Sequence, residues 1–501
     1  MSCKLFDGDA LRRHGSVALI FLFIATGCVS MAPTYERPPL PVMDHYPLRM
    51  EEEVIGTGNP AAATDWHVYF SDRRLQDVIA QALENNRDLR IAVSRVEEAR
   101  AAYGIQRAEQ FPSIGLGVDA SRSRIPGDLN LTGKPLMGNQ FQVALGVSAW
   151  EIDFWGRVRS LKEAALESYF ATDEAQQAVT VSLIAQVANS YLALRELDER
   201  LILARQTTAS RAESLRIFRR RVEVGATSHL ELTQVETLWQ QATTLGAQLE
   251  QARATQANAL TLLVGASVEL GTPPEKFDDA SVLKESAVGM PSDLLLDRPD
   301  IVAAEHQLKA ANANIGAARA AFFPRIALTA SYGTASAELD GLFGSGSAAW
   351  NFAPSLILPL FDGGLRRNNL SLAQARKTRA VAEYEKTIQE AFRDVADALA
   401  ASHWLGVQVQ TLQATRAVQT ERARLAKLRY DNGAAAFLEV LDAQRDLLTV
   451  EQQWVQARRA LLSSRVGLYA ALGGGTHYLA AEGSTSPSAS ANSSAHSIKA
   501  K

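Results

Sequence analysis

Hydrophobic residues recur at helical spacing over long stretches of this chain. After Gly156 the helical pattern continues without glycine or proline until Gly225, about 70 residues, or on the order of 100 Å of helix. Spacings of three, four or seven residues predict a coiled-coil seam through Ile184, Val187, Tyr191, Leu194 and Leu201. A second helical pattern returns from Leu230 to Gly265. The two patterns predict a long helical hairpin with its tip near Gly225.

Four short segments instead alternate apolar with small or polar residues, at about 113–122, 140–154, 325–334 and 348–360. They predict two β-hairpins, at about 113–154 and 325–360. Each segment is about ten residues, the length that a tilted strand needs to cross a bilayer. A hairpin packed on a soluble core would alternate in the same way, but the adjoining helices supply no strands to complete such a sheet. Pro354 and Pro359 weaken the last strand, since proline cannot donate to a ladder.

The chain is also built twice. Proline disfavours the helical conformation in the residue before it, so Pro112 and Pro324 each mark a corner from helix to strand, 212 positions apart. After the corners the offset becomes 208, as between Gly225 and Gly433. We therefore expect a duplicated helix and β-hairpin unit, with a second helical hairpin whose tip lies near Gly433.

These patterns divide the chain into six parts. We expect a lipoprotein signal peptide at 1–27, an extended proline-rich leader at 28–63, the first repeat at 64–270, a connection at 271–293, the second repeat at 294–475 and a disordered Ser/Ala-rich tail at 476–501.

The N-terminus has basic residues before an apolar run, and Gly27 is followed directly by Cys28. That order resembles a bacterial lipoprotein signal, in which the cysteine becomes the lipidated first residue of the mature chain. An ordinary secreted chain with a stray cysteine is the alternative. Val29 is not the aspartate that commonly retains lipoproteins in the inner membrane, so we expect the outer membrane of a Gram-negative bacterium.

Composition narrows the function further. The chain is 47% hydrophobic and 21% charged, which is typical of a globular protein, and its net charge of −4 comes from dispersed residues, which argues against nucleic acid. No apolar run past the N-terminus approaches the length of a transmembrane helix. No histidine pair has metal-ligand spacing, and no phosphate-binding loop or nucleophile elbow occurs. We expect no metal, no cofactor and no enzymatic activity.

Four spanning strands are too few to close a barrel, and an open edge in lipid leaves backbone groups unpaired at a cost of several kcal/mol each. The chain must therefore oligomerise. Three copies would supply twelve strands, enough to surround a lumen, whereas two would supply eight, whose interior side chains tend to fill. We expect a homotrimer.

Five motifs carry a family resemblance: residues 294–301 (LLLDRPDI), 305–308 (EHQL), 310–319 (AANANIGAAR), 151–159 (EIDFWGRVR) and 360–364 (LFDGG). They resemble the TolC/OprM-type outer-membrane efflux channels, in particular the lipoprotein branch called the NodT family, over about residues 28–475. Trp155 replaces the more usual phenylalanine. The resemblance implies a mainly α-helical chain that forms, as a trimer, a twelve-stranded membrane β-barrel on a periplasmic α-helical barrel.

The function implied by the resemblance is that of an exit duct in a tripartite efflux system. Such a duct passively conducts drugs or other small molecules that reach it from an inner-membrane RND-type transporter and a periplasmic membrane-fusion adaptor. Two alternatives come from other classes: a trimeric coiled-coil scaffold or adhesin without transport, and a periplasmic enzyme. The four amphipathic strands argue against the first, and the lack of a catalytic constellation argues against the second.

The resemblance also implies a periplasmic gate. Glu439 and Asp442 are three residues apart, so they share a helical face and would form two stacked acidic rings in a trimer. In the resembling family, residues at the positions of Tyr430 and Glu231 take part in contacts that hold the entrance shut. Ala435 stands where some relatives have an arginine. The alternative is that Glu439 only complements the dipole of the last helix.

Overall fold

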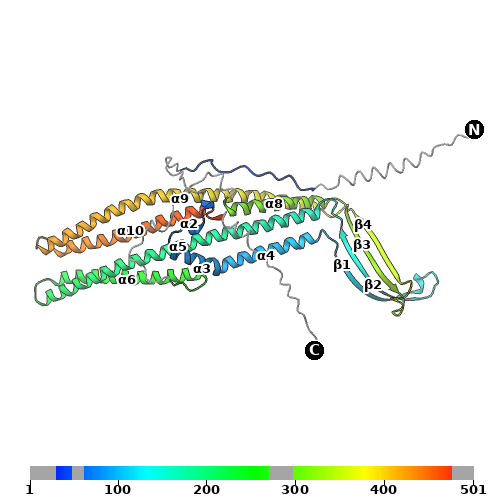
Figure 1. Cartoon of the computed structure of the whole chain (residues 1–501), viewed down its shortest axis with the longest axis horizontal. Coiled ribbons are helices and arrows are strands. Elements are labelled where there is room, and N and C mark those ends of the chain that lie inside the picture. The colour runs from blue at the N-terminus through cyan, green and yellow to red at the C-terminus, as the bar shows by residue number, and fades with distance from the viewer. Residues whose placement is uncertain (1–29, 48–60, 270–296, 477–501) are drawn as a thin grey trace, which may run out of the picture. The chain divides into compact units, whose positions relative to one another are not determined.

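The computed structural model describes residues 30–47, 61–269 and 297–476 (Figure 1). Cys28, the predicted connection at 271–293 and residues 477–501 of the predicted tail lie outside the described residues. The chain forms two compact units, one made of Met1–Pro39, Arg95–Thr172 and Ala303–Tyr384, the other of Leu40–Ser94, Asp173–Val302 and Glu385–Lys501. Each unit takes segments from both sequence repeats.

The first unit contains a four-stranded antiparallel sheet in the order β1-β2-β3-β4. Its strands are β1 (Ile114–Ile125), β2 (Leu136–Glu151), β3 (Arg325–Ser336) and β4 (Ala348–Ile357), and the short helix η3 (Gly127–Leu129) lies in the loop after β1. Pro354 does lie within β4, paired with Leu328. Within one chain β4 is an edge strand, the position at which proline is usually found in a sheet.

The leader lies against α8 (Pro299–Ala320) through one buried carboxylate. Glu305 is 4% exposed. It accepts hydrogen bonds from Arg37 Nη2 at 2.7 Å and from the Tyr35 hydroxyl at 3.1 Å, and Lys309 Nζ lies 3.2 Å away. We call these four residues the leader clamp. Burial alone would raise the pKa of Glu305, but the charge of Lys309 and the hydrogen bonds from Arg37, Lys309 and Tyr35 outweigh burial and lower the pKa.

Further along α8 the leader backbone makes two close contacts. The Asn312 side-chain amide donates to the Pro33 carbonyl at 2.6 Å. At Gly316 an added Cβ would lie 2.7 Å from the Ala32 nitrogen, so only glycine leaves room for the leader here. The leader of this unit is therefore bound at several points along one helix.

The second unit consists mainly of long helices. Its elements are η2 (Ala61–Ala63), α2 (Trp66–Tyr69), α3 (Arg73–Asn85), α6 (His229–Val264) and α10 (Phe437–Ala471), with parts of α4 (Arg87–Ala108), α5 (Arg157–Glu223) and α9 (Leu365–Asp431). Helices α5 and α9 have 67 residues each and end before Gly225 and Gly433, whose φ angles are 71° and 73°. The left-handed conformation is open to glycine and ends each helix.

Among the described helices, only α5 contains a stretch of membrane-spanning length and apolarity, and 50% of that stretch is buried inside the protein. The packing of this stretch inside the protein accounts for its apolar composition. Asp198, which interrupts the apolar seam of α5, is 7% exposed and pairs with Arg253 of α6 at 2.5 Å. This polar position is therefore satisfied by the neighbouring helix.

In the sequence, a helical pattern runs without a clear break from Asp72 to Phe111 and predicts a single helix before the first corner, but the structure has two. The helix is interrupted at Asn86, between α3 and α4. The Asn86 side chain accepts from the Leu89 nitrogen at 2.8 Å and donates to the Leu263 carbonyl at 2.7 Å. It therefore caps α4 and holds the end of α6 at the same time.

The second repeat makes the equivalent contact with a different side chain. Arg298, which corresponds to Asn86 at the offset of 212, donates from Nη1 to the Ala471 carbonyl at 3.0 Å. The glycines that follow α6 and α10 pass equally close to the chain, because a Cβ on Gly265 or Gly473 would lie 2.5 or 2.2 Å from a backbone oxygen. We call these two equivalent junctions the helix-end locks.

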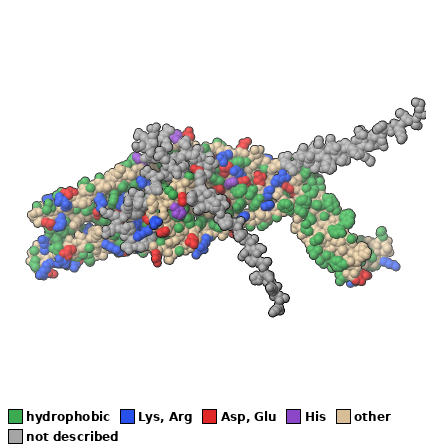
Figure 2. Space-filling model, viewed as in Figure 1, with side chains coloured by type: hydrophobic (Ala, Val, Ile, Leu, Met, Phe, Trp, Pro, Cys, Tyr) green, Lys and Arg blue, Asp and Glu red, His purple; other side chains and the backbone are tan. Residues whose placement is uncertain are grey.

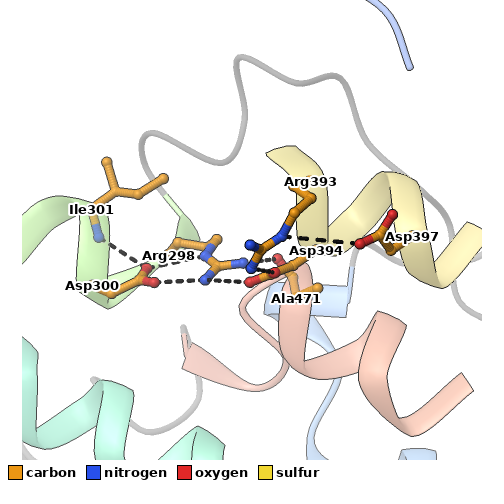
Figure 3. A network of polar contacts seen from close by, with 7 residues as sticks. All are labelled: Arg298, Asp300, Ile301, Arg393, Asp394, Asp397 and Ala471. Carbon is orange, nitrogen blue, oxygen red and sulfur yellow. Dashed lines mark hydrogen bonds and ion pairs between the residues drawn. The ribbon is translucent and has the colours of Figure 1, made fainter. Parts of the chain in front are cut away.

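Only the second lock is ionic (Figure 3). Arg298 Nη2 lies 2.6 Å from Asp300 and 3.7 Å from Asp394 of α9, and Arg393 pairs with Asp394 at 2.9 Å. Burial would lower the pKa of Arg298, but the two aspartates outweigh it and raise the pKa. The lock of the second repeat thus connects α8, α9 and α10, and the network lies at a cavity of about 960 Å³.

We predict that Glu305→Gln releases the leader clamp and lowers the free energy of unfolding by about 1–3 kcal/mol at neutral pH, since charge-assisted hydrogen bonds to a buried group are lost. The pKa of Glu305 is lowered in the folded state, so its contribution is present above the ordinary carboxyl pKa of about 4.3 and is lost as the pH falls through the folded value. Thermal unfolding at pH 7 measures the first effect, and a series of unfolding measurements at pH values falling below about 4 measures the second.

Glu36→Gln is the matched control, because Glu36 is an exposed neighbour on the same leader. It should leave the unfolding temperature unchanged. Equal unfolding temperatures for Glu305→Gln and the wild type at pH 7 would contradict the clamp.

Candidate functional site

The two faces of the sheet differ sharply in polarity. The register places Leu116 opposite Leu145, Leu145 opposite Tyr332 and Tyr332 opposite Trp350. Because alternate residues of a strand share a face, the large apolar side chains of all four strands lie together. The opposite face carries small and polar residues, among them Gly117, Gln142, Ser331 and Asn351.

The apolar face has no cover within the described part of the chain. Leu116, Tyr332 and Trp350 are 66%, 69% and 76% exposed, and Figure 2 shows hydrophobic side chains spread over this part of the molecule. A soluble monomer rarely exposes a contiguous apolar face of this extent. The outer edges of β1 and β4 also lack strand partners among the described residues. The apolar face of the sheet is therefore suited to an apolar environment such as lipid. The outer edges of β1 and β4 can pair with strands of other chains.

The two corners of the duplicated unit meet at the base of the sheet. Glu151, with a side chain 11% exposed, pairs with Arg157 and Arg325, each at 2.8 Å. Trp155 donates from Nε1 to the Pro324 carbonyl at 2.9 Å and stacks on Phe323 with ring centroids 4.6 Å apart. The motifs around Trp155 and Pro324 therefore fix the strands of both repeats to each other.

The two helical tips have the same backbone but different side-chain chemistry. At the first tip, Ser228 and Glu231 form a capping box, in which the Glu231 nitrogen donates to Ser228 Oγ at 3.2 Å. At the second tip Ala436 occupies the capping position, and its methyl side chain accepts no hydrogen bond from the helix. Glu439, the counterpart of Glu231, instead pairs with Arg429 at 2.6 Å.

Asp442 also has a basic partner in its own chain. It lies 3.2 Å from Arg445, and their side chains are 43% and 54% exposed. The side chain of Glu439 is 41% exposed. Both carboxylates of the suspected gate are thus on the surface of the monomer, and each lies next to a guanidinium group.

Tyr430 connects the two tips. Its hydroxyl accepts a hydrogen bond from Arg221 of α5, and the Arg221 guanidinium carbon lies 5.8 Å from the Tyr430 ring centroid. Phe437 lies beside both helices, with ring centroids 4.9 Å from Tyr430 and 4.5 Å from Phe218. A buried apolar cluster lies beneath these rings, formed by Leu215, Phe218, Val235 and Leu441.

The structure therefore groups the suspected gate residues in part. Glu439 and Asp442 lie together in the first two turns of α10, and Tyr430 lies near the end of α9. Glu231 is engaged in its capping box rather than with Tyr430. The sequence reasoning missed Arg221, Arg429 and Arg445. The repeat offset of 208 was a usable signal for the first two, since it relates Arg221 to Arg429.

Among the described residues, no group of three or more His, Cys, Asp and Glu is placed to hold a metal ion. The family profile described as outer membrane efflux protein matches residues 78–266 and 290–474. The two matched stretches start 212 and end 208 residues apart, the offsets of the internal duplication. The chain belongs to the outer membrane efflux protein family.

Individual members of the family are similar in sequence to this protein over nearly the whole chain. The solvent efflux pump outer membrane protein SrpC of Pseudomonas putida is 44% identical over 468 residues, covering 92% of this chain and 98% of the relative. Outer membrane protein OprJ of Pseudomonas aeruginosa is 42% identical over 460 residues, covering 92% and 95%.

Solved structures of this efflux protein family have the same fold. A membrane protein from Pseudomonas aeruginosa superimposes with a TM-score of 0.83 at 42% identity, covering 89% of this chain and all of that one. The open state of the MtrE outer membrane channel of Neisseria gonorrhoeae gives a TM-score of 0.81 at 37% identity, covering 89% and 99%. The fold class and the outer-membrane location predicted from the sequence are confirmed.

Proposed function

We propose that this outer membrane efflux protein is the passive exit duct of a tripartite pump, built from three copies of the chain. The observation that carries the proposal is the four-stranded sheet, with one apolar face, one polar face and two open edges. Three such sheets give twelve strands whose edges pair with one another, so no backbone group is left unpaired in lipid. The polar faces then line a water-filled lumen.

The energy for transport comes from elsewhere in this proposal. The relatives are named as outer membrane proteins of solvent, toluene and antibiotic efflux pumps. By analogy, the chain receives small organic molecules from an inner-membrane RND-type transporter through a periplasmic adaptor. A wide aqueous duct needs no binding pocket, so the pump selects the cargo.

The first prediction from this proposal is that the purified protein is a trimer that conducts ions in a planar bilayer and hydrolyses no ATP. Native mass spectrometry gives the stoichiometry, and conductance is recorded on the same preparation. A monomer without conductance would rule out the duct and favour the scaffold alternative.

We further propose that Cys28 is lipidated and anchors the leader to the outer membrane. The signal-like run that ends at Gly27 supports this assignment. Cys28→Ser should yield a protein without acyl chains, as measured by mass spectrometry of the mature N-terminus. A wild-type chain that begins at another residue without a lipid would contradict the anchor.

We also propose that Glu439 and Asp442 line the narrow periplasmic end, with Arg429 and Arg445 holding them in place. Three copies bring six carboxylates and six guanidinium groups to that ring. The permeating ions then respond to whichever charges face the lumen, because charges at a constriction act over about 8–10 Å at physiological salt. Exposed pairs of this kind contribute only about 0–1 kcal/mol to stability, so their removal leaves the fold intact.

If the carboxylates face the lumen, Glu439→Gln with Asp442→Asn should raise conductance and lower the preference for cations. Arg429→Gln with Arg445→Gln is the matched control and should raise that preference. Reversal potentials in a salt gradient measure both. If Glu439 only complements the helix dipole, the first variant should lose about 0.3–1 kcal/mol of stability and keep the wild-type selectivity, and that result would reject the gate.

A further inference from the structure

The apolar face of the sheet ends in two arginines. On β1, Ile114, Leu116, Val118 and Ala120 alternate with small and polar residues, and the same alternation continues to Arg122 and Arg124. The register places Arg122 opposite Asn139 and Arg124 opposite Met137 of β2. Since residues two apart on a strand share a face, both arginines lie on the apolar side, about 6.6 Å apart.

Neither arginine is neutralised by its own hairpin. Within the described part of the chain, neither side chain has a hydrogen bond or an ion pair. The nearest acidic residues along the hairpin are Asp119, which lies on the opposite face, and Asp128, which lies past the end of the strand in η3. The guanidinium groups of Arg122 and Arg124 thus remain available to an external anion.

The depth of Arg122 and Arg124 in the membrane follows from the proposed placement of the sheet in the outer membrane. This inference rests on that placement. In the first unit, the loops after β1 and β3 lie at the end of the sheet away from its helices, the extracellular end. Figure 2 shows both basic and acidic side chains at the loop end, beyond the hydrophobic surface of the sheet. Arginine is costly in the hydrocarbon centre and is tolerated near the interface. The two side chains therefore lie at the level of the outer-leaflet headgroups.

We propose that Arg122 and Arg124 form a binding site for the phosphate groups of an outer-leaflet glycolipid. The chemistry is complementary, because guanidinium binds phosphate through two parallel hydrogen bonds and keeps its charge at any physiological pH. The apolar residues that precede the arginines on the same face contact the acyl chains of the lipid. One glycolipid molecule thus contacts β1 with both its acyl chains and its phosphate groups.

The test measures lipid retained by the purified trimer. The probes are a bisphosphorylated lipid A and the same acylated glycolipid without phosphates, and native mass spectrometry counts the bound molecules after detergent washing. Wild-type protein should retain the phosphorylated lipid about tenfold more strongly, the loss expected when charge-assisted hydrogen bonds are absent. Inorganic phosphate should not displace it, because the acyl contacts are part of the site.

The variant Arg122→Gln with Arg124→Gln should abolish the preference for phosphates, and Arg122→Lys with Arg124→Lys should keep part of it. Arg367→Gln with Arg376→Gln removes the same charge from exposed positions of α9 and should bind like the wild type. If the glutamine variant fails to assemble into trimers, the lysine variant still tests the phosphate preference.

Equal retention of the two lipids by the wild type, or an unchanged preference in the glutamine variant, would overturn the proposal. A wild type without phosphate preference whose glutamine variant falls apart into monomers would overturn it too, because the arginines would then hold acidic residues of a neighbouring copy. Conductance of the same preparations separates this outcome from a failure of the duct. A conducting trimer without phosphate preference rejects only the lipid site.

Discussion

The rest of the structure depends on one constraint, that backbone hydrogen-bonding groups in lipid must find partners within the protein. The sheet of one chain leaves the outer edges of β1 and β4 unpaired among the described residues, so a single copy cannot be stable in a membrane. Duplication of the hairpin unit gives four strands, and three copies give the twelve that close on themselves. Residues as separate in sequence as Trp155 and Pro324 must then hold the two hairpins in one register, which is the role of their 2.9 Å hydrogen bond.

Because the unit is duplicated, the helix-end lock and the helical tip each occur twice. In both cases the two repeats have the same backbone geometry and different side-chain chemistry. The helix-end locks use an amide at Asn86 and a guanidinium at Arg298 to reach equivalent carbonyls. At the tips, Glu231 caps its own helix together with Ser228, whereas Glu439 has alanine at the equivalent position and pairs with Arg429. In both places the second repeat makes an ion pair where the first makes a hydrogen bond. The exposed Arg429–Glu439 pair is weakened by added salt, whereas the largely buried Arg298–Asp300 pair is screened much less.

Much of this fold is readable from the sequence, because periodicity, proline corners and glycine tips are local signals. The membrane strands, both long helices and the duplication follow from them. The interruption at Asn86 was not predicted, because asparagine can lie within a helix or cap one. Its cap on the Leu89 nitrogen is local, but its contact with Leu263, a residue far along the chain, exists only in the folded protein. Arg429 was missed for a similar reason, because it reaches Glu439 from α9 across the folded tip. Arg445 was open to prediction, because it lies three residues after Asp442 on the same helix, the spacing that also relates Glu439 to Asp442.

The helical unit is not held with equal strength along its length. Midway along α5, Asp198 and Arg253 pair with side chains 8% and 34% exposed, and Arg458 of α10 pairs with Glu199 with side chains 8% and 20% exposed. Removing one partner of a buried pair costs about 3–5 kcal/mol, because the other charge is left in a poorly solvated place. At the tip, Arg429 and Glu439 are 56% and 41% exposed, and such pairs exchange with water at a cost of about 0–1 kcal/mol. A movement that separates the tips therefore breaks weak contacts and the aromatic packing around Phe437, while the middle of the unit stays closed.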